Sequence, residues 1–289
     1  MALTAHGAAP APTSVHRATT HAMRYHLALP QGWVASRSWP VLVVIPDAAR
    51  EFEDNLMQFV RARADRPYIL VAPEVLSCGG AGSRTRDHYS YSATVWDSLQ
   101  GGDDFAFEDA GLAAVLADVR KQWHGESRAF LTGWEAGGHA VWAQTFRHPE
   151  RWRGVAPVTT NYQHRGVTDS TFSRAPERKS LPIQPFRCGA PSAGAAAALP
   201  SVDQQTAVDA ARGTRSRILS EPGSPRPRRR SRAAHGSGAR VVRLAAAAIA
   251  GTIFGADAVE PKLYPSCKQP PRSSLTCLHT AAFASLCSP

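Results

Sequence analysis

The sequence predicts an α/β protein with a doubly wound, mostly parallel sheet, followed by a C-terminal third that is incomplete or disordered. Short apolar runs alternate with helical patterns between residues 41 and 158, and this alternation implies parallel strands joined by helical crossovers. Residues 128–139 combine an apolar run, a turn bounded by glycines and the start of a helix. The composition then changes after Arg178, where alanine, glycine, proline and arginine dominate.

The first predicted elements are two buried strands with a helix between them, preceded by an edge strand. Residues 23–29 alternate well enough for an edge strand, which Pro30 ends. Residues 41–45 form a continuous β-branched and leucine run, typical of a strand covered on both faces. Residues 68–72 predict the next buried strand. The helix between them has one apolar face, made of Phe52, Leu56, Phe59 and Val60.

The second half of the predicted sheet follows a long loop at residues 77–102, which is rich in Gly, Ser, Arg, Asp and Tyr. Asp103 and Asp104 are suited to cap a helix. Residues 129–132 predict a strand, residues 137–147 a helix, and residues 155–158 a further strand. The helix after Asp104 has an apolar face, made of Leu112, Val115, Leu116, Val119 and Trp123.

Three regions follow from composition and charge: a disordered N-terminus at residues 1–20, an α/β domain at residues 21–178, and a low-complexity basic tail at residues 179–289. The net charge of +10 comes from the tail, which holds 15 of the 33 Lys and Arg but only 5 of the 23 Asp and Glu. The remaining 178 residues therefore carry 18 charges of each sign. A nucleic-acid argument from global charge applies only if the tail itself is the binding element.

Two interpretations of the tail remain open. It is either a disordered basic arm or the product of a frameshift near residue 187 in a GC-rich gene, and we favour the second as a hypothesis. Its motivation is that arginine, alanine, proline and glycine dominate out-of-frame GC-rich codons. Sequencing the gene across codons 180–250 tests it, and an unbroken frame there would end it.

The turn at residues 133–138 has the spacing G-x-x-x-G-G, with Glu135 at its centre. Together with the block at residues 103–107, which leads into the preceding helix, it resembles the α/β-hydrolase superfamily. It looks most like the polyhydroxyalkanoate depolymerase and feruloyl esterase branch, with Glu in place of the nucleophilic Ser. The resemblance covers less than half of the chain.

The resemblance implies a serine-esterase site at the nucleophile elbow. Position 135 would hold the nucleophile, and the backbone amides of Ala136 and of Ala48 or Ala49 would form the oxyanion hole. A catalytic acid and then a histidine would follow later in the chain, where chain order offers Asp203, Asp209 and His235. His139 is expected to be a packing residue.

Three residues are candidates for substrate binding: Asp47, Trp134 and Tyr91. Each has a plainer interpretation. A bulky residue such as Trp134 usually packs under an elbow turn, and the group of Tyr89, Tyr91 and Trp96 either lines a cleft or pins the long loop to the sheet.

Glu135 sets the functional alternatives. A carboxylate can act as a covalent nucleophile, but one at a helix N-terminus competes for the amides that an ester's oxyanion needs. The first hypothesis is an esterase-like hydrolase that works through Glu135. The second is a non-catalytic pseudoenzyme that binds a small ligand or a protein partner. The third, ranked last, is a nucleic-acid-binding basic arm.

We expect no cofactor and no metal, because no histidine pair has metal-ligand spacing and the five cysteines include no C-x-x-C pair. The expected partner is a small-molecule ester or similar ligand, with no membrane and with no main role for nucleic acid. No apolar stretch approaches the roughly 20 residues of a membrane helix. Residues 1–14 lack a basic start followed by an apolar run, so we expect no signal peptide and a cytoplasmic location.

Overall fold

The structure is a computed structural model, and it describes residues 13–78, 86–99, 102–160, 162 and 165–185. Six strands form one sheet in the order β1-β2-β4-β3-β5-β6. Strands β4, β3, β5 and β6 are parallel to one another. At one side of the sheet, β2 pairs antiparallel with β4 and β1 pairs antiparallel with β2. The predicted α/β class with a mostly parallel sheet is confirmed.

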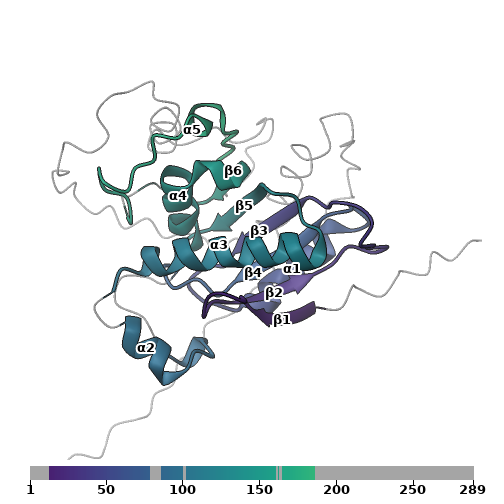
Figure 1. The fold of residues 1–289 in the computed structure, drawn as a ribbon, viewed down its shortest axis with the longest axis horizontal. Helices are drawn as coiled ribbons and strands as arrows, with labels where there is room; N and C mark the ends of the chain where they lie inside the picture. Colours follow the sequence, from purple (N-terminus) through teal and green to yellow (C-terminus); the bar gives the residue numbers. More distant parts are fainter. Residues whose placement is uncertain (1–12, 79–85, 100–101, 161, 163–164, 186–289) are drawn as a thin grey trace, which may run out of the picture. The chain divides into compact units, whose positions relative to one another are not determined.

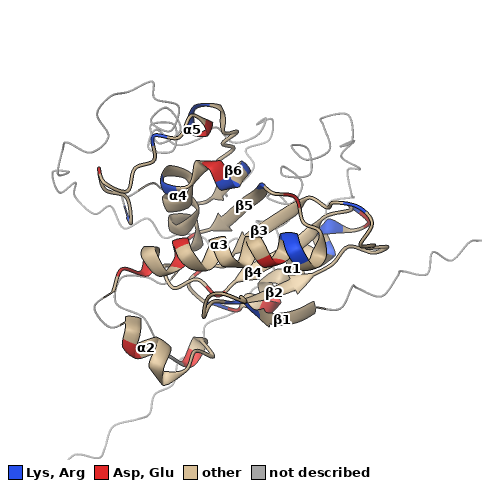
Figure 2. Ribbon diagram, in the orientation of Figure 1, with Lys and Arg blue, Asp and Glu red and all other residues tan. Residues whose placement is uncertain are grey.

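The parallel strands come from the apolar runs in the sequence. They are β3 (Val41–Ile45), β4 (Ile69–Pro73), β5 (Ala129–Trp134) and β6 (Trp152–Val158). The first three of these strands contain no charged residue and are drawn entirely in tan in Figure 2. They can be buried on both faces because helices cover both faces.

Side chains of β3 alternate between two hydrophobic clusters, one on each face of the sheet. Val41, Val43 and Ile45 belong to the cluster that contains α3 (Asp104–Trp123) and α4 (Gly137–Arg147). Leu42 and Val44 belong to the cluster that contains α1 (Phe52–Arg63). The sheet is therefore doubly wound, and Figure 1 shows the long helix α3 running across it.

The helix α3 begins as its sequence predicts. The Asp103 carboxylate accepts a hydrogen bond from the Phe105 amide at 3.0 Å and caps the first turn. His124 ends the helix in a left-handed conformation with φ of 57°. The helix α4 has the predicted bounds, and the short 3₁₀ turn η2 (Pro149–Arg151) follows it.

Three expectations from the sequence are wrong. Residues 13–17 are not disordered but form β1 (Thr13–Arg17), which pairs along its whole length with β2 (Arg24–Ala28), so β2 is not an edge strand. The folded domain also extends beyond residue 178, because Leu181 and Ile183 are buried and Ile183 bridges to Val155 of β6.

The third correction concerns the segment expected to be one long loop. Its described part contains the 3₁₀ turn η1 (Arg86–His88) and the helix α2 (Ala93–Leu99). A last short helix, α5 (Glu177–Ser180), precedes the bridge at Ile183. The predicted tail at residues 179–289 lies outside the described residues from position 186 onward. Within the described ranges, no helix is long and apolar enough to cross a membrane.

Candidate functional site

The candidate site lies where β3 and β5 end, at the carboxyl edge of the parallel strands. These two strands are neighbours, and Ile45 of β3 pairs with Gly133 of β5. The helix after β3 covers one face of the sheet and the helix after β5 covers the other. Diverging connections of this kind open a crevice at the sheet edge, which is the usual ligand position in doubly wound folds.

Glu135 is the first of the two residues that connect the end of β5 to the start of α4. Its φ is +49°, a left-handed conformation that costs a non-glycine residue of order 1 kcal/mol. Its amide donates a hydrogen bond to the Val158 carbonyl at 3.1 Å, and its carbonyl accepts one from the Gly138 amide at 3.2 Å. Its side chain is exposed, so the backbone presents this carboxylate outward at the crevice.

The glycines around Glu135 are required by close backbone approach. A Cβ on Gly137 would lie 2.1 Å from the Pro46 carbonyl oxygen, and one on Gly138 would lie 2.0 Å from Thr160 Cγ2. A Cβ on Gly133 would meet Val141 at 2.9 Å. A side chain at Gly137 would push α4 away from the loop after β3, and one at Gly138 would push it away from the segment after β6. The G-x-x-x-G-G spacing therefore permits the tight turn.

Asp47 lies at the matching position after β3, two residues past Ile45, as Glu135 lies two residues past Gly133. Its Oδ1 accepts the Ala49 amide hydrogen at 3.1 Å, and its Oδ2 accepts the Trp134 Nε1 hydrogen at 3.4 Å. The Ala49 amide is therefore already engaged. The exposed Ala48 and the half-buried Ala136 stay predictions as oxyanion-hole donors.

Left-handed residues gather at this edge of the sheet. Among the described residues, five non-glycine residues have positive φ, and three of them follow parallel strands at their carboxyl ends: Arg50 after β3, Glu135 after β5 and Thr159 after β6. Unfavourable backbone conformations of this kind concentrate at functional sites. This gathering supports the crevice as the site.

The aromatic candidates are packed rather than open to the crevice. Trp134 is 4% exposed, and its ring lies 5.9 Å from that of Phe59 beneath the turn. Tyr91 is buried, and its hydroxyl donates to the Glu74 carbonyl at 2.7 Å. It belongs to a small apolar cluster that fastens α2 and its flanking loop: Phe52, Leu76, Tyr89, Tyr91, Trp96 and Leu99.

The predicted general base and acids fall on a part of the chain that the structure does not describe. His235, Asp203 and Asp209 lie outside the described residues. His139 is half-buried in the first turn of α4, where burial and then the charge of Arg165 lower its pKa. It is therefore mainly neutral at pH 7.

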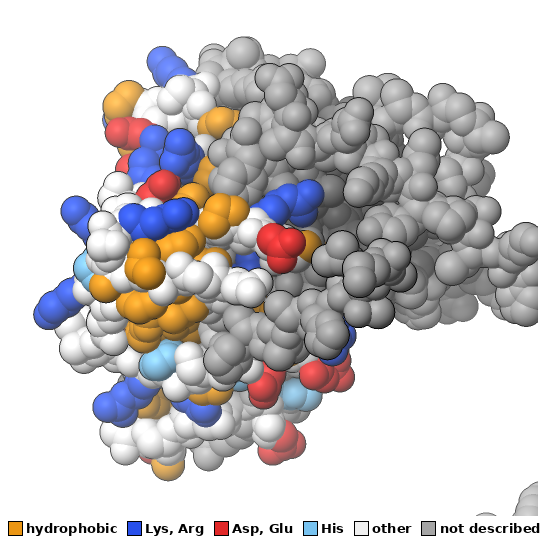
Figure 3. Space-filling model, turned by 90° about the vertical axis from the view of Figure 1, so that its right-hand side faces the viewer, with side chains coloured by type: hydrophobic (Ala, Val, Ile, Leu, Met, Phe, Trp, Pro, Cys, Tyr) orange, Lys and Arg blue, Asp and Glu red, His pale blue; other side chains and the backbone are white. Residues whose placement is uncertain are grey.

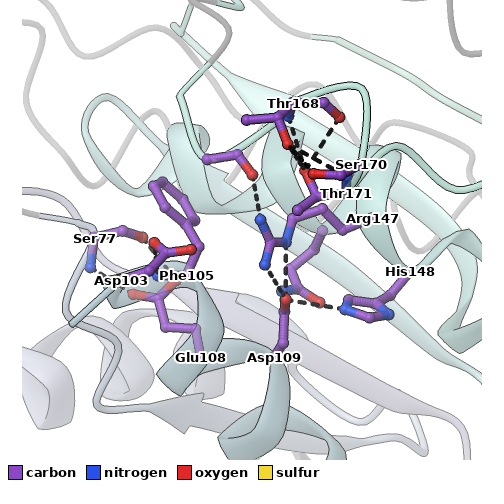
Figure 4. A network of polar contacts seen from close by, with 12 residues as sticks. Ser77, Asp103, Phe105, Glu108, Asp109, Arg147, His148, Thr168, Ser170 and Thr171 are labelled. Carbon is purple, nitrogen blue, oxygen red and sulfur yellow. Dashed lines mark hydrogen bonds and ion pairs between the residues drawn. The ribbon is translucent and has the colours of Figure 1, made fainter. Parts of the chain in front are cut away.

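Sequence reasoning missed one buried carboxylate behind the crevice, that of Glu108 on α3. This side chain has no solvent exposure, and it accepts a hydrogen bond from the Leu76 amide. It also accepts hydrogen bonds from the amide and the hydroxyl of Ser77 (Figure 4). Glu108 thus holds the chain where it leaves β4. A signal was present, because Glu108 is four residues before Leu112, on the apolar face of the helix.

The described residues contain no group of three or more His, Cys, Asp and Glu side chains placed to hold a metal ion. Cys78, the cysteine that the structure describes, is buried, and burial raises the pKa of its thiol to about 12. It is an inert packing residue at neutral pH.

No family model matches this chain, and no curated protein matches it in sequence. Several solved structures have a similar arrangement. Poly(aspartic acid) hydrolase-1 from Sphingomonas sp. KT-1 matches with a TM-score of 0.44 and 15% identity, over 71% of this chain and 83% of that one. A thermostable esterase matches with a TM-score of 0.43 and 13% identity, over 71% of this chain and 52% of that one. Epoxide hydrolase A from Mycobacterium thermoresistibile matches with a TM-score of 0.36 and 20% identity, over 55% of this chain and 43% of that one.

This chain spans about half of the esterase and less than half of the epoxide hydrolase. TM-scores below 0.5 and identities below 25% assign neither a family nor an activity to it.

Proposed function

We propose that this chain has an α/β-hydrolase-like scaffold of esterase type, whose elbow does not hydrolyse esters efficiently and instead presents Glu135 to a small ligand. The supporting observation is the combination of a left-handed backbone at Glu135 with an exposed carboxylate at the switch point of the sheet. The backbone of a nucleophile elbow is retained, while the residue that it presents has different chemistry.

Ester hydrolysis is disfavoured at this crevice by charge. The tetrahedral intermediate carries an oxyanion, which the amides at the start of α4 would have to stabilise. Two carboxylates, Asp47 and Glu135, stand at matching positions just after the neighbouring strands β3 and β5. Their negative charge opposes a developing oxyanion and favours a ligand with a positively charged or hydrogen-bond-donating group.

A second candidate function is catalysis through Glu135 as a covalent nucleophile. The observation that favours it is the same left-handed elbow, which aims the side chain into the crevice rather than into the core. The two candidates differ in one measurable respect, because only the second requires turnover that depends on the carboxylate.

The experiment is hydrolysis of 4-nitrophenyl acetate by the full chain and by its Glu135→Gln and Glu135→Ser variants. We expect wild-type turnover within a few fold of the uncatalysed rate, and the same for Glu135→Gln, because loss of the serine nucleophile typically lowers turnover by about 10⁶-fold. Wild-type activity that disappears in Glu135→Gln would overturn the proposal in favour of the second candidate. A gain of activity in Glu135→Ser would show that only the nucleophile is missing.

A further inference from the structure

A cavity of about 530 Å³ lies at the amino edge of the parallel strands, the opposite edge from Glu135. Its walls come from Ser38, the last turn of α3, the segment leading into β5 and the start of β6. Figure 1 shows the end of α3 and the connection to β5 at this side of the sheet. Figure 3 looks onto this side, where Lys and Arg side chains border a hydrophobic patch.

The charged residues that line this cavity are mostly positive. Arg120, Arg128 and Arg153 line it, and Glu126 is the acidic residue in its wall. Arg153 forms an ion pair with Glu126 at 2.6 Å, but its side chain remains 55% exposed. Within the described ranges, Arg120 and Arg128 form no ion pair. Two positive charges are therefore not compensated by protein carboxylates.

The cavity wall is fixed by backbone hydrogen bonds. The Trp39 amide donates to the His124 carbonyl at 2.8 Å, and the Glu126 amide donates to the Trp39 carbonyl at 2.8 Å. Arg128 donates from Nη2 to the Trp152 carbonyl, while its buried Nε has no hydrogen-bond partner. The buried Nε cannot reach a ligand, but the guanidinium is held in place and keeps its positive charge in the wall.

We propose that this cavity binds a small molecule that carries a phosphate monoester group. Such a group has a charge of about −1.5 to −2 at pH 7, which matches the two uncompensated arginines. Its terminal oxygens accept the paired donors of guanidinium groups, and the hydroxyls of Ser38 and Ser127 add donors to the wall. The volume is in the range of small-molecule sites, so it accommodates an organic group as well as the phosphate.

One feature of the wall opposes an anion, namely the negative end of the α3 dipole. Its effect is reduced because the Val119 carbonyl in the last turn accepts hydrogen bonds from the His124 and Gly125 amides. Arg120 and Lys121 in the same turn carry opposite charge to the helix end. The arginines therefore set the sign of the potential in the cavity.

The test is calorimetric titration of the full chain with phenyl phosphate, inorganic phosphate and benzoate at constant ionic strength. Arg120→Gln is the main variant, because this exposed side chain lines the cavity. Lys121→Gln is its matched control, since Lys121 is the next residue of α3, is exposed, and does not line the cavity. Arg153→Gln is a second variant, and circular dichroism melting checks that each variant folds.

We expect saturable binding of phenyl phosphate that is weakened about tenfold or more by Arg120→Gln and by Arg153→Gln, and less than twofold by Lys121→Gln. No saturable binding of either phosphate compound at 10 mM would overturn the proposal. Equal losses in Arg120→Gln and Lys121→Gln would also overturn it, because they would show attraction by surface charge alone. Benzoate binding as tight as phenyl phosphate would contradict the phosphate preference. None of these outcomes depends on ester hydrolysis at Glu135.

Discussion

The backbone conformation at Glu135 follows from the glycines on either side of it. Gly137 lets α4 start directly against the Pro46 carbonyl, and Gly138 lets the same turn pack on Thr160. With both contacts in place, the first residue after β5 has to reverse the chain in a left-handed conformation. The strain at Glu135 is thus imposed by its neighbours and does not depend on which side chain stands there.

Replacing Gly137 by alanine tests this explanation. In an ordinary helix this change gains roughly 1 kcal/mol from helix propensity. Here the new Cβ would lie 2.1 Å from a backbone carbonyl oxygen, which cannot move without displacing the loop after β3. We expect Gly137→Ala to lower the free energy of unfolding by about 2–3 kcal/mol, measured by urea denaturation.

The matched control is Gly102→Ala, where the new Cβ would meet its nearest atom, the Leu99 carbonyl oxygen, at 3.4 Å. This variant should stay within about 0.5 kcal/mol of the wild type. If Gly137→Ala is as stable as the control, close packing does not explain the glycine.

At the level of single residues, the sequence predicted the tight turn at Glu135 but not its surroundings. The glycine spacing around Glu135 predicts the tight turn, because only residues without a Cβ fit where the backbone comes this close. The packing of Tyr91 and the burial of Glu108 depend on which elements meet in three dimensions. For Tyr91 the sequence left a cleft-lining role and a packing role open. The hydrogen bond from its hydroxyl to the Glu74 carbonyl favours the packing role.

Among the elements, α3 and α4 are joined by a polar contact as well as by apolar packing. Asp109 of α3 accepts hydrogen bonds from Gln144 at 2.7 Å and from Arg147 Nε at 2.8 Å, and His148 Nε2 lies 3.1 Å away (Figure 4). Arg147 also donates to the Gly166 carbonyl, so it ties the segment after β6 to the same pair of helices. Burial raises the pKa of Asp109, but hydrogen bonds from His148 and Arg147 outweigh burial and leave the pKa below its ordinary value.

We therefore expect Asp109→Asn to lower the free energy of unfolding by about 3 kcal/mol, because it leaves the Arg147 guanidinium buried without its counter-charge. The side chain of Arg147 is 7% exposed, so water cannot replace the lost carboxylate. Chemical denaturation followed by circular dichroism measures the change. Asp169→Asn, at an exposed loop position, is the control and should have little effect. A small loss for Asp109→Asn would show that the apolar contacts alone hold the two helices together.

The elements that were predicted correctly are those whose own residue pattern is sufficient to identify the element type and its bounds. Both faces of β3 are covered, so its run of five apolar residues is unambiguous, and α4 is bounded by glycines and by Pro149. The strand β1 was missed because it is polar and is held by backbone hydrogen bonds to β2. The helix α2 was missed because it stands in a polar segment and is fastened by Trp96 and Leu99, which pack against distant aromatic residues.

At the scale of the whole chain, the excess positive charge lies outside the part of the chain that forms the described domain. The part up to Arg178 carries balanced charge, and the described domain lies almost entirely within it. The positive cavity at the amino edge and the carboxylates at the carboxyl edge are therefore local features of a neutral domain. They give the two edges of one sheet opposite electrostatic character, which a net charge does not reveal.

The buried Glu108 links this domain's stability to pH. Burial is the main reason that its pKa is raised to about 7, and hydrogen bonds from Ser77 and Leu76 offset only part of that effect. In the unfolded chain the same carboxyl ionises near its ordinary value of 4.5. Between these two values the folded state keeps a proton that the unfolded state has released. The contribution of Glu108 to stability is therefore fully present below about pH 4.5 and is lost as the pH rises through 7.

A shift of this size amounts to about 3 kcal/mol across the window, at about 1.4 kcal/mol for each pH unit. Glu108→Gln removes the titration and keeps an acceptor for the Leu76 and Ser77 amides. We expect the free energy of unfolding of this variant, relative to the wild type, to rise by about 3 kcal/mol between pH 4.5 and pH 7.5, measured by urea denaturation at half-unit intervals. Glu51→Gln, at an exposed position before α1, should leave the wild-type slope unchanged. Parallel curves for the wild type and Glu108→Gln would mean that Glu108 is ionised in the folded protein throughout this range, and the chain leaving β4 would then be held by a buried charge.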